Sequence, residues 1–466
     1  MTNLKYTSEE PIAAVATSLA PAALGIVRCS GRNCIELLSK AFSRPKALLA
    51  AGGNTIVYGW ILDAVGGAGS ARIDEVLVSV FRAPRSFTGE DMAEISCHGG
   101  VHVVQTILNL LLRIGFRAAE KGEFTFRAYI NGKADLTRAE AVREIIDSKT
   151  NAGRSRAAGR LAGNLCAAID GVKRLVIDTL AAIEVGIEYP EDEETIADTF
   201  DTDALERARD TLTELRDSWR SERIYQDGAR VVLCGRTNAG KSSLFNALLK
   251  EDRAIVSDTE GTTRDFLESW IDFDGIPARL FDTAGLRETS DAVEAVGVER
   301  ARDLSEDADL ILYLVDARIG MSAEDEAFVR WRTKDEAHRT PLILVWNKCD
   351  GADGDIFRSE YALPQVRVSA KQGIGLGALC GTVREILSVP EKTERCGASL
   401  GSERQKVAVE NALESVSHAL SLTGDYALDA VVQDLEDALD FLGEVTGDVT
   451  PEDVLDSVFS HFCVGK

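Results

Sequence analysis

A glycine-rich loop that ends in lysine and serine restricts what this chain can fold into more than any other segment. Residues 235–242 read GRTNAGKS and fit the pattern G-x-x-x-x-G-K-[ST]. The loop follows a predicted strand and opens a predicted helix, the context in which its backbone N–H groups wrap phosphates. Lys241 supplies a point charge, Ser242 offers a hydroxyl to Mg²⁺, and the helix N-terminus adds partial positive charge. The pattern predicts a phosphate-binding P-loop domain.

Near-continuous apolar runs recur around this loop. They are residues 230–234, 278–281, 310–315 and 341–346. Such runs are typical of parallel strands that are buried on both faces, and their alternation with helices indicates an α/β domain. We expect this domain to cover residues 228–389.

Three further motifs follow these strands in order. Asp282-Thr283-Ala284-Gly285 places an acid near the Mg²⁺ shell and a glycine amide where it can sense a γ-phosphate. Asn347-Lys348-Cys349-Asp350 places a carboxylate that takes two hydrogen bonds from guanine, which adenine does not offer. Ser369-Ala370-Lys371 completes the base site. With Thr263 as a further hydroxyl for Mg²⁺, the motifs predict binding and hydrolysis of GTP.

One position departs from the usual GTPase pattern. Many GTPases place a glutamine after the glycine of the second motif, where it orients the attacking water. Here that residue is Leu286, which cannot hydrogen-bond water. Two interpretations remain open: a slow switch that waits for an activating protein, or an acid elsewhere that works with an extra cation.

The flanking regions predict two further domains. Residues 1–130 mix short strands with a helix over 101–114, which indicates an α+β domain. Apolar residues recur at helical spacing over 131–227 and again over 390–466. The simplest architecture is a helical domain that is interrupted by the inserted nucleotide domain.

Composition narrows the classes of partner and compartment. The 466 residues carry a net charge of −24, which argues against a chain that coats nucleic acid by charge alone. The nine cysteines are scattered without a C-x-x-C pair, which argues against zinc or a disulfide framework. A reducing cytosol fits this pattern. We expect no signal peptide and no membrane span.

The motifs, taken together, resemble those of the MnmE (TrmE) family of tRNA-modification GTPases, within the TrmE-Era-EngA-like superfamily. The C-terminal FCVGK, residues 462–466, is the most specific match. The other matching segments are 235–243, 261–265, 282–287, 446–449, 87–91, 98–100 and 122–124. The resemblance covers essentially the whole chain. It implies a tetrahydrofolate-binding N-terminal domain that also pairs two chains, a helical domain and an inserted P-loop GTPase domain.

The resemblance also implies how hydrolysis is catalysed. A potassium ion beside the GTP would take the place of the arginine finger of other GTPases, and such a charge is worth about 4–7 kcal/mol. Its implied ligands are Asn238, Ser257, Thr259 and Thr262. Glu294 matches the acid that orients or activates water. The GTP-binding set becomes Asn238, Ala239, Gly240, Lys241, Ser242, Ser243, Ser257, Thr262, Thr263, Asp282, Thr283, Ala284, Gly285, Asn347, Lys348, Asp350, Ser369, Ala370 and Lys371, with Ser242 and Thr263 on Mg²⁺.

A folate site follows from the same resemblance. Arg28, Glu94, Lys133 and Lys466 match positions that contact 5-formyltetrahydrofolate. Glutamate can pair with the donor edge of a pterin, and cations can hold carboxylates. Cys463 matches a cysteine tied to the modification reaction. The chain departs from the family in a glycine-poor loop at residues 18–24, and in Asp258-Thr259-Glu260 ahead of residues 261–265.

The implied activity is chemical. With the FAD-dependent partner MnmG, a homodimer of the chain would add an aminomethyl or carboxymethylaminomethyl group to carbon 5 of the wobble uridine of certain tRNAs. Tetrahydrofolate would supply the carbon, and GTP hydrolysis would drive the conformational cycle. Two alternatives are a regulatory ribosome- or RNA-associated GTPase, and a folate-binding methyltransferase that carries a GTPase regulator.

Overall fold

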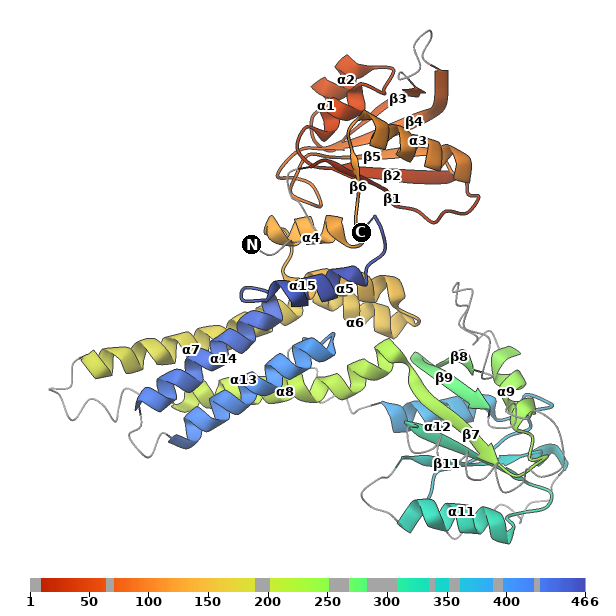
Figure 1. Cartoon of the computed structure of the whole chain (residues 1–466). Coiled ribbons are helices and arrows are strands. Elements are labelled where there is room, and N and C mark those ends of the chain that lie inside the picture. Colours follow the sequence, from red (N-terminus) through yellow and green to blue (C-terminus); the bar gives the residue numbers. More distant parts are fainter. Residues whose placement is uncertain are drawn as a thin grey trace. The chain divides into compact units, whose positions relative to one another are not determined.

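The computed structural model describes residues 10–63, 71–188, 202–250, 268–282, 308–334, 340–351, 361–388, 397–422 and 428–465 (Figure 1). The chain forms two compact units. One comprises residues 1–143, 169–205 and 414–466, and the other comprises residues 144–168 and 206–413. None of the described helices is long and apolar enough to cross a membrane.

The first unit contains a six-stranded sheet in the order β3-β4-β5-β2-β1-β6. All its neighbouring strands are antiparallel except β1 and β6. The strands are β1 (Ile12–Val15), β2 (Leu24–Ser30), β3 (Thr55–Asp63), β4 (Ala71–Phe81), β5 (Met92–His98) and β6 (Arg117–Ala118). The structure confirms the short strands and the helix over 101–114 that we expected here, and it also contains two short helices, α1 (Cys34–Ser39) and α2 (Pro45–Ala50).

Helices cover one face of this sheet. Alternate residues of β4, such as Val76, Val78 and Val80, join a buried cluster with α1 and with α3 (Val101–Ile114). The residues between them point the other way, and Leu77 remains 46% exposed. The sheet therefore has one packed face and one that is open at β3 and β4.

A second, smaller core joins the C-terminal helix to the segment that follows the sheet. Phe126 of α4 (Glu123–Ile130) meets Phe459 of α15 (Glu452–Ser460) edge to face, with ring centroids 5.3 Å apart. Leu136 of α5 (Leu136–Asp147) and Phe462 complete this cluster. The first unit also contains most of α7 (Asn164–Glu188) and all of α14 (Leu428–Thr446).

The second unit contains the predicted α/β domain. Its sheet has the order β12-β11-β10-β7-β9-β8, and it is parallel except for β8. The strands are β7 (Ala229–Gly235), β8 (Glu268–Phe273), β9 (Ile276–Asp282), β10 (Leu310–Asp316), β11 (Leu342–Asn347) and β12 (Gln365–Arg367). The antiparallel β8 was not expected. It pairs with β9, and a tight turn at Asp274-Gly275, where both residues have positive φ, connects the two strands.

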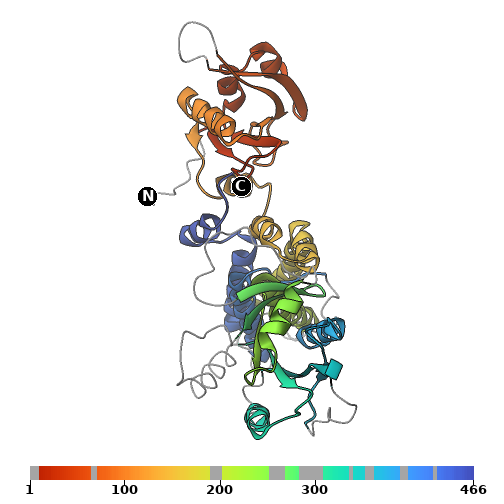
Figure 2. The ribbon, with the colours of Figure 1, turned by 90° about the vertical axis from the view of Figure 1, so that its right-hand side faces the viewer.

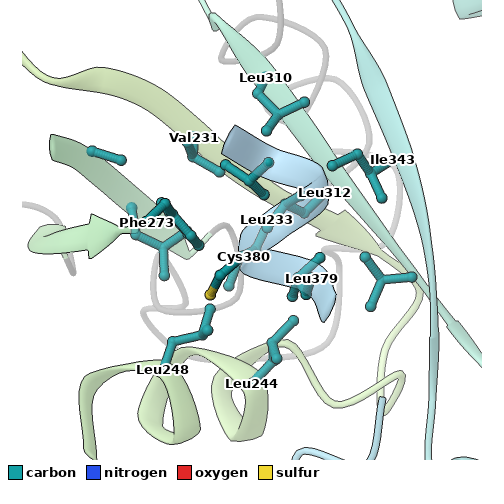
Figure 3. Close-up of a cluster of buried hydrophobic side chains, with 14 of the residues drawn as sticks. Val231, Leu233, Leu244, Leu248, Phe273, Leu310, Leu312, Ile343, Leu379 and Cys380 are labelled. Atoms are coloured by element: carbon teal, nitrogen blue, oxygen red, sulfur yellow. The ribbon is translucent and has the colours of Figure 1, made fainter. Parts of the chain in front are cut away.

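Both faces of this sheet are buried, as the apolar runs predicted. Leu312 and its equivalents pack against α9 (Lys241–Lys250) and α12 (Leu376–Leu387), which Figure 3 shows in detail. Ile311 faces the opposite way, into a cluster with residues of α11 (Ala323–Lys334). The helices on this sheet can be followed in Figures 1 and 2.

This unit also contains most of α8 (Thr202–Asp227), which leads along the chain into β7 and the P-loop. Helix α6 (Asn151–Leu161) contacts α8, and the start of α13 (Glu403–Leu422) belongs to the same unit. Arg160 of α6 is buried and donates to Glu222 of α8 at 2.8 Å and to Ser399 at 2.8 Å. These bonds tie the entry to β7 to the segment that returns from the sheet.

Candidate functional site

The P-loop lies between β7 and α9, as the motif required. Gly235 and Gly240 both have positive φ, and a side chain would not fit at either position. A Cβ on Gly240 would lie 2.1 Å from the Nδ2 atom of Asn347. The Lys241 ammonium donates to the carbonyl of Gly235 at 2.7 Å, so the lysine crosses the mouth of the loop. The loop is thus shaped by close backbone approach.

Two of the oxygen donors that we expect near Mg²⁺ are described, and they lie together. The Ser242 hydroxyl donates to the Oδ2 atom of Asp282 at 2.8 Å, and Asp282 is buried at the end of β9. Oxygen donors of this kind, a hydroxyl and a carboxylate, suit Mg²⁺. The residues present therefore fit the metal that the sequence implied.

Asn347 links the second half of the site to the P-loop. It is buried at the end of β11, and its Nδ2 atom donates to the Ala239 carbonyl at 2.9 Å. Its Oδ1 atom accepts from the backbone N–H groups of Lys348 at 2.9 Å and Ala370 at 3.1 Å. One side chain thereby fixes three segments of the predicted site.

The carboxylate that we expect to read guanine is held in place by its neighbours. The Ser369 hydroxyl donates to Asp350 at 2.6 Å, and this bond is the main reason that the pKa of Asp350 is lowered. Gln372 donates to the other carboxylate oxygen at 3.4 Å. Asp350 therefore stays ionised and oriented, as an acceptor of two hydrogen bonds must be.

Several predicted site residues lie outside the described residues. They are Ser257, Thr259, Thr262, Thr263, Thr283, Ala284, Gly285, Leu286, Glu294 and Lys466. Ser243 and Lys371 are described. Ser243 lies in the first turn of α9, directly after the P-loop, and Lys371 follows Ser369 and Ala370.

Two of the predicted folate residues, Arg28 and Glu94, lie on the face of the N-terminal sheet that is opposite to α1 and α3. Arg28 on β2 pairs in register with Glu94 on β5, and its Nη2 and Nε atoms lie 2.8 and 2.9 Å from Glu94 Oε1. The guanidinium also lies 5.7 Å from the ring centroids of both Phe87 and Phe124. The pair is thus placed by strand register and by two aromatic rings.

The C-terminal segment reaches this pair. Arg28 Nη1 donates to the carbonyl of Gly465 at 3.1 Å, and Val464 forms a β-bridge with Lys121. Gly465 has φ +96°, and a Cβ there would lie 2.5 Å from the Val15 carbonyl oxygen, so only glycine fits. Cys463, two residues earlier, is exposed.

Lys133 contacts the loop that carries Phe87. Its Nζ atom donates to the Pro84 carbonyl at 3.1 Å, and its side chain packs beside Gly89. The glycine-poor loop at residues 18–24 also has a defined position, because Ala22 donates to the Gly99 carbonyl at 3.1 Å. Gly99 approaches this loop closely, because a Cβ there would lie 2.4 Å from Ala22 O.

Sequence reasoning missed several residues of the site. Asp316 ends β10 beside Asn347, and it accepts from Lys348 Nζ at 2.8 Å. Its position, directly after a buried strand and level with the other motifs, was a signal that could have identified it. Phe87 and Phe124 lie inside matched segments, but nothing in their spacing indicated that they flank Arg28.

Two models of known protein families match this chain, and together they cover most of its length. The model described as "MnmE helical domain" matches residues 136–463, and the model described as "GTP-binding protein TrmE N-terminus" matches residues 11–133.

Full-length relatives are similar throughout. A tRNA modification GTPase MnmE from Treponema denticola is 51% identical over 99% of both chains. A protein of the same name from Carboxydothermus hydrogenoformans is 41% identical, over 98% of this chain and 100% of its own. Among solved structures, Era from Aquifex aeolicus bound to GDP·AlF4⁻ is 26% identical over 40% of this chain and 66% of the Era chain, with a TM-score of 0.28.

Proposed function

The chain belongs to the MnmE family of tRNA modification GTPases, and on that premise we propose that it modifies carbon 5 of the wobble uridine of certain tRNAs together with the FAD-dependent protein MnmG. The group added is aminomethyl or carboxymethylaminomethyl, and a tetrahydrofolate supplies its one-carbon unit. The arrangement that carries this proposal is the Arg28–Glu94 pair with the Gly465 carbonyl, because a GTPase that only switches needs no such site.

The GTP site performs the hydrolytic part. In the proposal, Lys241 and the P-loop amides hold the phosphates, Ser242, Thr263 and Asp282 face Mg²⁺, and Asp350 selects guanine. When bound, Mg²⁺ neutralises charge on the phosphate oxygens. Asp350 supplies specificity because a base without the matching donors leaves a carboxylate unpaired.

Water activation is assigned to Glu294, since Leu286 cannot take the role of glutamine. Asn238 is the described member of the potassium set that also includes Ser257, Thr259 and Thr262, and it has φ 63° in the P-loop. Bound K⁺ would place positive charge beside the phosphates. GTP hydrolysis by the full chain should then be much faster in K⁺ than in Na⁺. Equal rates in the two salts would refute the potassium site.

The folate site is proposed on chemical grounds. Glu94 can accept from the donor edge of a pterin, and Arg28, Lys133 and Lys466 can hold carboxylates. Cys463 is exposed beside the tail that contacts Arg28, so we assign it a part in the modification reaction.

The wider assembly is also a proposal. We infer a homodimer through the N-terminal domain, a heterotetramer with MnmG that binds tRNA, and a cytoplasmic location. We retain the domain limits 1–130, 131–227, 228–389 and 390–466 as functional divisions.

Mass spectrometry of wobble nucleosides tests the central proposal. Cells that lack the protein should lose the carbon-5 modification, and the wild-type gene should restore it. A gene carrying Arg28→Gln should restore it poorly. If cells without the protein kept the modification, the alternative of a regulatory RNA-associated GTPase would stand.

A further inference from the structure

An acidic residue that belongs to none of the GTP motifs lies against the guanine-binding motif. Asp316 is the last residue of β10 and pairs in register with Asn347, the last residue of β11. The Ala317 amide donates to the Asn347 carbonyl at 2.8 Å, so the two strand ends are joined directly. The carboxylate is therefore fixed at the strand edge where the nucleotide motifs gather.

The Asp316 carboxylate faces two cations. Its Oδ2 atom accepts from Lys348 Nζ at 2.8 Å and from Arg318 Nη2 at 2.7 Å, while Oδ1 accepts from Arg318 Nε at 3.0 Å. Asp316 is mostly buried, with 11% of its side chain exposed, whereas Arg318 is 51% exposed. The bond from Arg318, followed by that from Lys348, holds the pKa of Asp316 well below its ordinary value. The carboxylate is thus a permanent negative charge.

Lys348 spans the distance from this carboxylate to the P-loop. Its Nζ atom also donates to the Asn238 carbonyl at 2.6 Å, and its backbone adopts φ 64°. A lysine stem has four rotatable carbons and loses much conformational freedom when it is held in one geometry. Two acceptors, the Asp316 carboxylate on β10 and the Asn238 carbonyl in the P-loop, hold the ammonium in one position.

We propose that Asp316 is a positioning residue for guanine nucleotide, which acts by anchoring the Lys348 ammonium so that the lysine stem is held extended between β10 and the P-loop. The inference rests on the proposed nucleotide site, in which Lys348 and Asp350 belong to the same motif. Asp316 touches neither phosphate nor base in this account. Its effect is to pre-organise Lys348, which lowers the entropy lost when nucleotide binds.

This role predicts a specific change in the kinetics of nucleotide binding. Loss of the anchor should weaken nucleotide binding, mainly through faster dissociation, and should leave the hydrolytic step alone. Asp316→Asn keeps the shape and removes the charge. We expect it to raise the dissociation rate of a fluorescent N-methylanthraniloyl GDP by roughly tenfold, since the Lys348 ammonium loses its charged acceptor while the Asn238 contact remains. At saturating GTP, kcat should stay within about twofold.

A double-mutant cycle tests whether Asp316 acts through Lys348. Lys348→Ala alone should also accelerate dissociation, and adding Asp316→Asn to it should have no further effect. Asp316→Glu, which keeps the carboxylate, should recover part of the affinity. The matched control is Asp309→Asn, the same change just before the opposite end of β10, where the carboxylate accepts from the Arg230 amide; it should leave dissociation unchanged.

Either of two results would overturn the proposal. In the first, Asp316→Asn releases nucleotide at the normal rate although Asp350→Asn weakens guanine binding. That result would remove the role of Asp316 and keep the nucleotide site. The other is full additivity of Asp316→Asn and Lys348→Ala, which would indicate a general structural role. If Asp350→Asn itself left guanine binding intact, the proposed nucleotide site would fall, and the role of Asp316 with it.

Discussion

The sheet of the nucleotide domain is covered on both faces, whereas the N-terminal sheet is packed on one face and keeps exposed side chains such as Leu77 on the other. In the sheet of the nucleotide domain, the side chains predicted to bind ligands are found where strands end, as at Asp282 and Asn347. In the N-terminal sheet, Arg28 and Glu94 sit within strands, on the face that α1 and α3 leave uncovered.

The difference follows from strand direction. Parallel strands need helical crossovers, which cover both faces and leave the edge at the carboxyl ends of the strands for function. Antiparallel strands can be joined by short turns, so one face can remain available. The two candidate sites are therefore of different kinds. One is built from loops at the edge of a sheet, and the other from side chains on neighbouring strands of one sheet face.

The largest expected effects test whether both faces of the nucleotide sheet are needed. Ile311→Ala and Leu312→Ala remove neighbouring buried side chains that point to opposite faces of β10. Each should lower the free energy of unfolding by about 2–5 kcal/mol, because each leaves a cavity. Urea titration of the full chain measures this. Ile319→Ala, at an exposed position, is the control. A neutral result for either buried position would contradict two-sided burial.

The matching pair in the N-terminal sheet should behave unequally. Val78→Ala should cost about 2 kcal/mol because Val78 is buried under the helices. Leu77→Ala should change stability by only about 0.5 kcal/mol, since Leu77 is largely exposed. The same urea titration measures both. Equal losses would mean that the open face is covered, and a dependence on protein concentration would identify a second copy as the cover.

A third comparison separates the two sites by ligand. Arg28→Gln should weaken binding of 5-formyltetrahydrofolate by roughly tenfold, about 1.4 kcal/mol, through loss of a charged contact, and it should leave GTP turnover unchanged. Isothermal titration and a phosphate-release assay report the two properties. Arg72→Gln, on the same sheet beside Trp60, should alter neither. A parallel loss of GTP turnover in Arg28→Gln would show that the sites are not separable in this way.

The smallest expected effect concerns a strand end in the N-terminal sheet. His98 ends β5, and its Nδ1 atom lies 2.7 Å from Asp74 Oδ1. This hydrogen bond raises the pKa of His98 above its ordinary value of about 6.5. Protonated His98 therefore adds stability that is complete below about pH 6.5 and is lost as the pH rises through the raised pKa.

Thermal unfolding of wild type and His98→Gln checks this sign. The wild type should be the more stable at about pH 5.5, and the difference should shrink towards about pH 8.5. Because His98 is exposed, the effect is that of a surface pair. A difference that did not change with pH would show that the ion pair contributes nothing.

The nucleotide domain was predictable from sequence because its signals are local. Apolar runs such as 310–315 identify buried parallel strands, and each motif follows its strand directly. The antiparallel β8 was missed, although the Asp274-Gly275 turn that joins it to β9 is a strong hairpin signal. Polar and apolar residues are mixed in β8, as in an edge strand, so it lacks the continuous apolar run that identified the other strands.

The contacts that shape both sites were less predictable because they join distant residues. Nothing in the sequence around Arg28 indicates that Gly465 lies beside it, and only the resemblance to the family suggested that the tail comes near. The bond of Asp316 was missed for a related reason, because its partner, Lys348, directly follows the next strand, 32 positions along the chain. Register and packing decide such pairs.

The bond from Arg28 to Gly465 joins residues that are 437 positions apart in the chain. On a translating ribosome, β2 emerges long before Gly465 is made, by roughly 20–90 s at ordinary rates of synthesis. Throughout that interval Arg28 has no tail carbonyl to donate to. A chain that is released before residue 465 is made therefore lacks this contact, whatever else of its N-terminal sheet has been synthesised.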